Sequence, residues 1–381
     1  MIHESPEPAA KHCVTDPDEK HDPHASRLGK FLAATIKFEA SDLIVKTGQP
    51  PKVRIRGGLK SLNTELVTKE DFKKIIEVTL TPEQKNDLHK FGSTDFAYDY
   101  DKQHRFRVNM FQARGQMALA ARLITSNIKR FEDLYLPPVL SEIAMQPQGI
   151  VLLAGVTGSG KSTTIASMLQ YINERKSVHI LTIEDPIEYI FQDVKATINQ
   201  REIGIDVLDF KIALRALVRE NPDIVLIGEM RDHETFEAAL QAAETGHLVF
   251  GTIHAASATQ TFSRIYDLFP AEEREQVRKL LAYTMRAIIY QKLLPTLHKD
   301  IPRIPGLEIL INNTVVQKYI LEGREGELQE VIRSTESQQV GMMDFNGSLV
   351  QLVEQEYIHV RTAMDATPNQ DELRMRLKGI Q

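Results

Sequence analysis

A glycine-rich segment, residues 155–162, constrains the fold of this chain more than any other part of the sequence. It reads Gly-Val-Thr-Gly-Ser-Gly-Lys-Ser and fits the pattern G-x-x-x-x-G-K-[ST], between an apolar run at 150–154 and a helical pattern at 163–174. Glycines let successive backbone N–H groups turn toward one point, and the helix that follows adds the positive end of its dipole. This context predicts a phosphate-binding loop in an α/β fold. The alternative, a chance glycine-rich turn, does not account for a strand, helix, lysine and serine in register.

The loop predicts the residues that bind the nucleotide. Lys161 is expected to reach the β- and γ-phosphates of ATP, and the Ser162 hydroxyl is expected to hold Mg²⁺. The predicted nucleotide-binding residues are Gly155, Val156, Thr157, Gly158, Ser159, Gly160, Lys161, Ser162 and Thr163.

Short apolar runs alternate with helical patterns from residue 149 onward, which indicates a parallel sheet covered on both faces. The runs lie at residues 150–154, 179–183, 224–227 and 248–253. Beyond Phe269 the apolar spacing predicts a helical stripe that continues through Met285, Ile288 and Ile289 and ends at Pro295. The remainder, to Gln381, is expected to form short strands and helices.

Two acidic groups follow apolar runs. Glu229 ends the run Asp223-Ile-Val-Leu-Ile-Gly-Glu229 and is predicted to hold the metal or to orient the attacking water, unless it is a solvated strand-end acid. Glu184, Asp185 and Glu188 cluster after residues 179–183. Several carboxylates at one strand end are costly unless a cation or a base role accounts for them.

Two histidines flank the run at residues 248–253. His254 follows the run at the same end as the loop and the acids, so it is predicted to face the γ-phosphate. His247 stands at the opposite end, where a structural or surface role is the simpler interpretation.

The region before the loop is expected to comprise three segments: a disordered tail at 1–27, a small α+β domain at 28–128 and a linker at 129–148 with one short helix. The tail holds prolines, charges and four histidines, whose spacing matches no tetrahedral metal site. The ATPase domain is expected to cover residues 149–381.

Composition excludes several classes of protein. The single cysteine, Cys13, excludes a disulfide framework and a four-cysteine zinc site within the chain. The net charge of −6 gives no support to a nucleic-acid partner. Neither a membrane span nor a secretory signal is evident, so we expect a cytoplasmic protein.

Six segments together resemble one protein family, the secretion ATPases of the type II/type IV pilus superfamily. Within it the resemblance is to the PilT/PilU branch of retraction motors, over about residues 28–350. The segments are GVTGSGKSTT, TIEDPIEY, NQREIG, LRALVRENPDIVLIGEMRD, AAETGHLVFGTIHA and LFPAEER.

The resemblance implies a fold, an assembly and roles for two acids. It implies a PAS-like N-terminal domain, a RecA-like P-loop ATPase domain and a homo-hexameric ring. It implies that Glu184 is the general base and that Glu229 assists metal and water positioning. It also implies a place at the inner-membrane base of the pilus, with the membrane platform protein and a paralogous pilus ATPase as partners.

Two arginines of the N-terminal region are predicted to act on the nucleotide. Arg107 alternates with apolar residues in 104–111, and Arg122 interrupts the apolar segment 118–124. An arginine among such neighbours needs an anion. The resemblance favours arginine fingers that reach the γ-phosphate; the alternative is an internal ion pair with Asp95 or Asp99.

The function predicted from these features is a Mg²⁺-dependent ATPase motor for type IV pilus retraction and twitching motility. Autonomous retraction motors carry Ala-Ile-Arg-Asn-Leu-Ile-Arg-Glu, whereas this chain has Val315-Val-Gln-Lys-Tyr-Ile-Leu-Glu322 and lacks both arginines. An accessory subunit that depends on a partner motor is therefore the alternative. A nucleic-acid translocase is a third hypothesis, which the net charge and the absence of an aromatic and basic strand-binding run disfavour.

Overall fold

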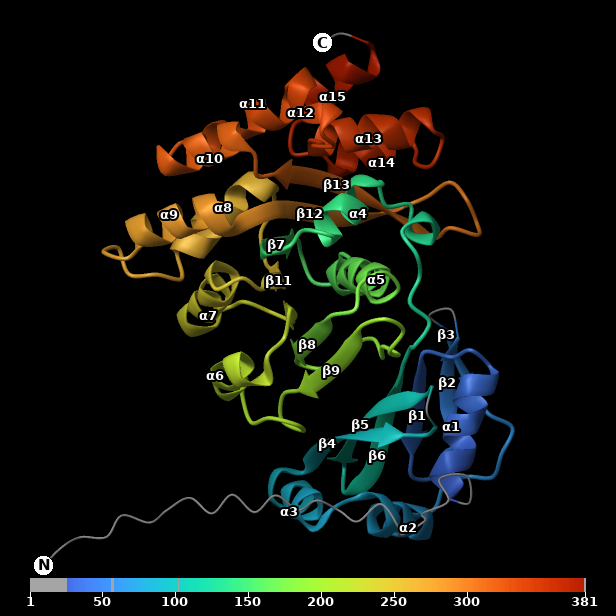
Figure 1. Ribbon diagram of the computed structural model, residues 1–381. Coiled ribbons are helices and arrows are strands. Elements are labelled where there is room, and N and C mark those ends of the chain that lie inside the picture. The colour runs from blue at the N-terminus through green and yellow to red at the C-terminus, as the bar shows by residue number, and fades with distance from the viewer. Residues whose placement is uncertain (1–25, 56–57, 102, 380–381) are drawn as a thin grey trace, which may run out of the picture. The chain divides into compact units, whose positions relative to one another are not determined.

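The structure, a computed structural model, describes residues 26–55, 58–101 and 103–379. The expected tail therefore lies, up to residue 25, outside the described residues. The chain divides into two compact units, one ending at Leu123 and the other beginning at Ile124 (Figure 1). Each unit is described by itself. Among the described residues, no helix is long and apolar enough to cross a membrane.

The first unit is built on a six-stranded sheet in the order β3-β2-β1-β6-β5-β4. The pairs β1–β2, β1–β6, β2–β3 and β4–β5 run antiparallel. Its elements are α1 (Arg27–Lys37), β1 (Asp42–Lys46), β2 (Lys52–Ile55), β3 (Gly58–Ser61), α2 (Lys69–Thr79), α3 (Pro82–Phe91), β4 (Ser93–Asp99), β5 (Arg105–Ala113) and β6 (Gln116–Ile124). The α+β organisation agrees with the prediction made from the sequence, and the likeness to a PAS domain stays a prediction.

Local sequence sets the helix boundaries of this unit. The Ser26 hydroxyl accepts a hydrogen bond from Gly29 N and caps α1, so Arg27 is helical and not part of a disordered tail. Thr68 opens α2 and Thr81 opens α3, each within a capping box. Gly92 ends α3 with a φ of 75°, a conformation that glycine adopts without strain.

The second unit is an α/β fold around a seven-stranded sheet in the order β13-β12-β7-β11-β10-β8-β9. All neighbouring strands run parallel except β13, which is antiparallel to β12. Its strands are β7 (Gly149–Ala154), β8 (His179–Glu184), β9 (Thr197–Glu202), β10 (Ile224–Ile227), β11 (Leu248–Ile253), β12 (Met285–Pro295) and β13 (Arg303–Ile311). The four predicted parallel strands are confirmed as β7, β8, β10 and β11.

Helices cover both faces of this sheet (Figure 1). The helices of this unit are α4 (Val139–Ala144), α5 (Lys161–Asn173), α6 (Phe210–Glu220), α7 (His233–Glu244), α8 (Ala258–Tyr266), α9 (Arg274–Thr284), α10 (Thr314–Leu321), α11 (Leu328–Arg333), α12 (Thr335–Gln339), α13 (Phe345–Glu354), α14 (Val360–Ala366) and α15 (Gln370–Leu377), with short 3₁₀ turns η1 (Glu132–Leu134) and η2 (Glu325–Glu327). The segment expected to be a linker contains α4, and its Phe131 and Leu140 are buried in the core of this unit.

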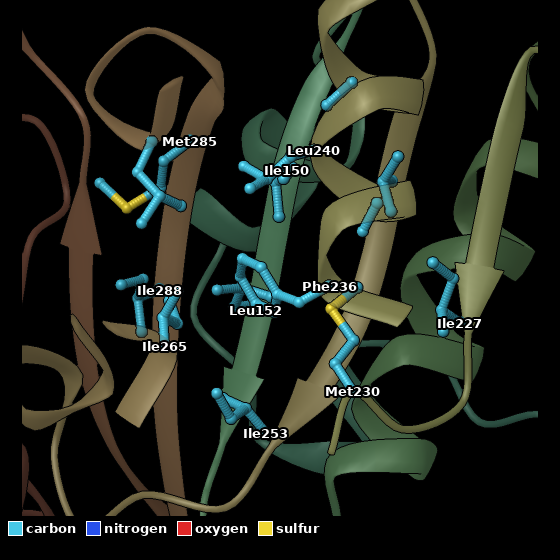
Figure 2. Close-up of a cluster of buried hydrophobic side chains, with 14 of the residues drawn as sticks. Ile150, Leu152, Ile227, Met230, Phe236, Leu240, Ile253, Ile265, Met285 and Ile288 are labelled. Carbon is cyan, nitrogen blue, oxygen red and sulfur yellow. The ribbon is translucent and has the colours of Figure 1, made fainter. Parts of the chain in front are cut away.

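Alternate side chains of β7 enter two separate cores. Ile150 and Leu152 pack toward α7, where Phe236 and Leu240 meet them (Figure 2). Val151 and Leu153 pack on the opposite face, with helices α4 and α5. Burial on both faces explains why the strand is apolar at almost every position and does not alternate.

The expected helix through Met285–Pro295 is wrong. That helix, α9, ends at Thr284, and Met285 begins β12, which pairs with β7 on one side and β13 on the other. Ile288 faces one core and Ile289 faces the other. A short apolar run satisfies both helical and strand patterns, and the two open hydrogen-bonding partners, β7 and β13, decide between them.

Candidate active site

The phosphate loop leaves the end of β7 at Ala154 and enters α5 at Lys161. Gly155, Gly158 and Gly160 have φ angles of 145°, 78° and 90°, a region that residues with a Cβ rarely adopt. The loop therefore needs glycine at these three positions. Backbone groups that turn inward here, at the start of a helix, form an anion site.

Lys161 is held inside this loop. Its Nζ donates hydrogen bonds to Gly155 O at 2.8 Å and to Val156 O at 3.1 Å, and the residue is 8% exposed. Burial lowers the pKa of the Lys161 ammonium, while the negative charges of Glu229 and Glu188 oppose that shift. The Lys161 ammonium is thus bonded to two carbonyls of the loop and lies in the field of the Glu229 and Glu188 carboxylates, next to the anion site.

The side chain of Glu184, at the end of β8, is buried. Thr182 Oγ1 donates to its Oε1 at 2.7 Å, and Gln200 Nε2 donates to the same oxygen at 3.3 Å. Burial raises the pKa of Glu184 from 4.5 to about 7, and these hydrogen bonds oppose the rise. A carboxyl group that titrates near neutrality is suited to accept a proton from water.

Glu229 lies close to Glu184 because their strands are neighbours. β8 and β10 pair in parallel up to Ile183 and Ile227. A Cβ on Gly228 would lie 3.2 Å from Glu184 Cα, so the glycine lets the ends of the two strands approach. The two acids therefore come to one edge of the sheet.

Two basic side chains accompany Glu229. The Arg231 guanidinium forms an ion pair with its carboxylate, and His254 Nε2 lies 2.9 Å from Glu229 Oε1. His247, by contrast, lies at the other end of β11, where its Nδ1 is 2.9 Å from Ala242 O. His254 is thus grouped with the acid and His247 is not.

One cavity of about 390 Å³ brings most of the predicted residues together, all of them in the second unit. The predicted residues that line it are Thr157, Gly158, Gly160, Lys161, Ser162, Thr163, Glu184, Glu229 and His254. Gly155, Val156 and Ser159 complete the loop but do not line the cavity.

A second cavity of about 290 Å³ shares Gly160, Thr163, Leu293 and Arg303 with the first. Its wall combines apolar residues, such as Leu134 and Ile301, with charged ones, such as Asp133 and Asp300. Its position beside the phosphate loop and the apolar part of its lining suit the base of a nucleotide.

The residues present also fit a magnesium ion. The Ser162 hydroxyl and the Glu229 carboxylate line the same cavity, and both offer the oxygen atoms that Mg²⁺ prefers. Mg²⁺ is usually held by one or two protein groups together with the phosphates of a substrate. Among the described residues, no group of three or more His, Cys, Asp or Glu side chains could hold a metal ion by itself.

The two predicted arginine fingers belong to the first unit. Arg107, on β5, is exposed, while Phe106 and Val108 on the other face are buried. Arg122, on β6, donates from Nε to Asp42 Oδ1 at 2.9 Å. Burial acts to raise the pKa of the Asp42 carboxyl, but hydrogen bonds from Ser41 and Arg122 hold that pKa below its usual value. Arg122 therefore has an internal anion, which is Asp42 and not Asp95 or Asp99 as the alternative expected.

Several residues that shape this site are not among the predicted ones. Thr182 and Gln200 orient Glu184, and Arg231 pairs with Glu229. Gln291, on β12, bonds to the phosphate loop and to the start of α5 from a segment whose apolar spacing predicts a helix. A single amide within the apolar run 285–294 is the signal that could have identified it.

Comparisons with known proteins show the family to which this chain is related. Residues 101–365 match the family model described as type II/IV secretion system protein. The chain is 39% identical over 326 residues to the type IV pilus retractation ATPase PilT of Pseudomonas aeruginosa, covering 86% of this chain and 94% of the relative. It is 35% identical over 350 residues to the type IV pilus ATPase PilU of the same species, covering 92% and 91%.

One solved structure is also similar to this chain in both fold and sequence. The crystal structure of the pilus retraction motor PilT with bound ADP has a TM-score of 0.84 and 41% sequence identity to this chain. The match covers 91% of this chain and 98% of that one. This chain belongs to the type II/IV secretion system protein family.

Proposed function

We propose that this chain is a Mg²⁺-dependent ATP hydrolase that powers retraction of a type IV pilus. The observation that carries the proposal is a single cavity that joins the phosphate loop, the buried carboxyl of Glu184 and the acid Glu229. Relatives named as a pilus retraction ATPase and as a pilus ATPase, each matched over most of its length, support the choice of filament.

In this proposal the loop and Lys161 bind the β- and γ-phosphates of ATP. The ammonium exchanges its hydrogen bonds to Gly155 O and Val156 O for the more strongly negative phosphate oxygens. Ser162 and Glu229 would hold Mg²⁺, which when bound would supply positive charge to offset the charge developing on those oxygens.

Glu184 acts as the general base. Its pKa of about 7 means that a substantial fraction is ionised at neutral pH and that the ionised group binds a proton readily. Thr182 and Gln200 hold one of its oxygens in place, so the carboxylate can be directed toward a water at the γ-phosphate. His254 and Arg231, both beside Glu229, orient that second acid.

The proposed assembly is a homo-hexamer at the cytoplasmic side of the inner membrane, next to the pilus platform protein. Arg107 and Arg122 are proposed to stabilise transition-state charge as arginine fingers. For Arg122 this requires exchange of Asp42 for phosphate, and the Arg122 side chain, 73% exposed, is accessible for that exchange.

An accessory role, dependent on a partner motor, is the second candidate function. It is favoured by the residues of α10, where hydrophobic and neutral side chains replace the arginines of autonomous motors. Deletion of the gene with and without a paralogous motor gene separates the two roles. An autonomous motor alone restores surface motility, whereas an accessory subunit does so only when its partner is present.

The central test is Lys161→Ala. We expect ATP turnover to fall by about a hundredfold or more, with loss of tight nucleotide binding, because the loop loses its cation. Lys211→Ala, which removes an exposed lysine paired with Glu234 on the surface, is the matched control and should hydrolyse ATP normally. Normal turnover in purified, folded Lys161→Ala contradicts the assignment.

A further inference from the structure

A buried glutamine on β12, Gln291, lies against the phosphate loop, and the proposed reaction does not use it. The residue is 2% exposed. It follows Tyr290, which pairs with Ala154 at the end of β7, so Gln291 reaches the level where the loop begins. It lies more than 100 residues from the loop in sequence.

Both ends of the Gln291 amide are bonded to the loop region. Nε2 donates to Ser159 O at 2.8 Å, and Oε1 accepts from Thr164 Oγ1 at 2.8 Å. These two partners stand on either side of Lys161 in the chain. Reversing the amide would place its oxygen against the Ser159 carbonyl, so the amide orientation is determined by the bonding.

The loop glycines pack directly on the same residue. A Cβ on Gly155 would lie 2.5 Å from Gln291 O, and a Cβ on Gly160 would lie 2.7 Å from Gln291 Nε2. At both positions there is no room for a side chain, so glycine lets the loop lie close against Gln291. Gln291 therefore contacts the loop at its beginning, through the main chain, and at its end, through the side chain.

We propose that Gln291 is a positioning residue of the phosphate loop. It acts through Ser159 and Thr164 to hold the loop N–H groups and Lys161 where they bind the phosphates of a nucleotide. This inference rests on the proposed ATPase function. Because the loop binds the phosphates in the ground state and in the transition state alike, loss of Gln291 should weaken binding more than it slows turnover.

Three variants test this role. Gln291→Met keeps the approximate volume of the side chain and removes both hydrogen bonds, and Thr164→Val removes only one. Lys292→Met is the matched control, since Lys292 is the next residue of β12 and its Nζ donates to Ala366 O at 3.2 Å, at the end of α14. The measurements are the Kd for ADP by calorimetry, KM and kcat for ATP, and the melting temperature.

We expect the Kd for ADP and the KM for ATP to rise about tenfold in Gln291→Met, since two hydrogen bonds of ordinary strength are lost. The kcat should change less than about threefold, and Thr164→Val should raise Kd by a smaller factor. The double variant, Gln291→Met with Thr164→Val, should bind ADP as tightly as Gln291→Met alone. Gln291→Met already lacks the hydrogen bond to Thr164, so the second change removes no further bond. The control should keep the wild-type Kd.

An unchanged Kd in folded Gln291→Met overturns the proposal, and so does a fall in kcat at constant KM. If Gln291→Met does not fold, Thr164→Val decides, and a wild-type Kd there also overturns it. Normal ADP binding by Lys161→Ala contradicts the proposed function itself. If Lys161→Ala binds ADP poorly while Gln291→Met binds it as the wild type does, only the proposed role of Gln291 is contradicted.

Discussion

Replacing Glu184 by glutamine should abolish activity and stabilise the protein at alkaline pH. Burial raises the pKa of this carboxyl from 4.5 to about 7. Because the folded-state pKa is higher than the unfolded one, the native state binds more protons between these values. The free energy of unfolding of the wild type therefore falls as pH rises through this window.

The magnitude follows from the shift. Each pKa unit corresponds to about 1.4 kcal/mol, so at pH 8 the ionised Glu184 destabilises the native state by about 3 kcal/mol, and at pH 5 by under about 1 kcal/mol. The glutamine carries no charge and can still accept from Thr182 and Gln200. It loses the hydrogen bond from the Glu188 backbone, which costs about 1 kcal/mol at either pH.

Denaturant unfolding at the two pH values measures this effect. We expect Glu184→Gln to be more stable than the wild type by about 2 kcal/mol at pH 8 and nearly equal to it at pH 5. ATP turnover should be lost while nucleotide binding is kept, since an amide cannot accept the proton. Wild-type turnover should itself rise with pH through about 7 as Glu184 ionises.

The control is Glu244→Gln, at an exposed position at the end of α7, where a surface substitution should change stability little at either pH. If the stability difference between Glu184→Gln and the wild type does not depend on pH, the inference that Glu184 is a buried carboxyl with a raised pKa is refuted. Retained turnover in Glu184→Gln, with Glu229→Gln inactive, would show that the roles of the two acids are reversed.

Two further predictions concern the arginines and the core. Arg107→Lys and Arg122→Lys should reduce kcat more than nucleotide affinity, because lysine keeps the charge but loses the bidentate geometry. If these variants assemble normally and keep the wild-type kcat, both arginines have only a structural role. Leu152→Ala, in the core shared with α7 (Figure 2), should lower the free energy of unfolding by about 2–5 kcal/mol, measured by denaturant titration. A loss below about 1 kcal/mol would mean that the surrounding side chains close the cavity.

The local parts of this site were predictable from the sequence. The pattern of residues 155–162, with a strand before it and a helix after it, depends on glycine conformation and on contacts between near neighbours in the chain. The continuous apolar runs likewise indicated parallel strands, because burial on both faces removes polar positions. Glu184 and Glu229 followed such runs, and strands that run parallel bring their ends to one edge.

Tertiary structure decided what depended on partners distant in the sequence. The apolar run after Thr284 fits a helix or a strand equally well, and it became β12 because β7 and β13 offered hydrogen-bonding partners. Asp42 became the partner of Arg122 because β1 and β6 pair in that register. The same strand placement brings Gln291 to the phosphate loop, a contact that no local pattern encodes. Sequence alone determined the chemistry of the loop, since that chemistry is local, whereas pairing across the sheet determined which distant side chains hold it in place.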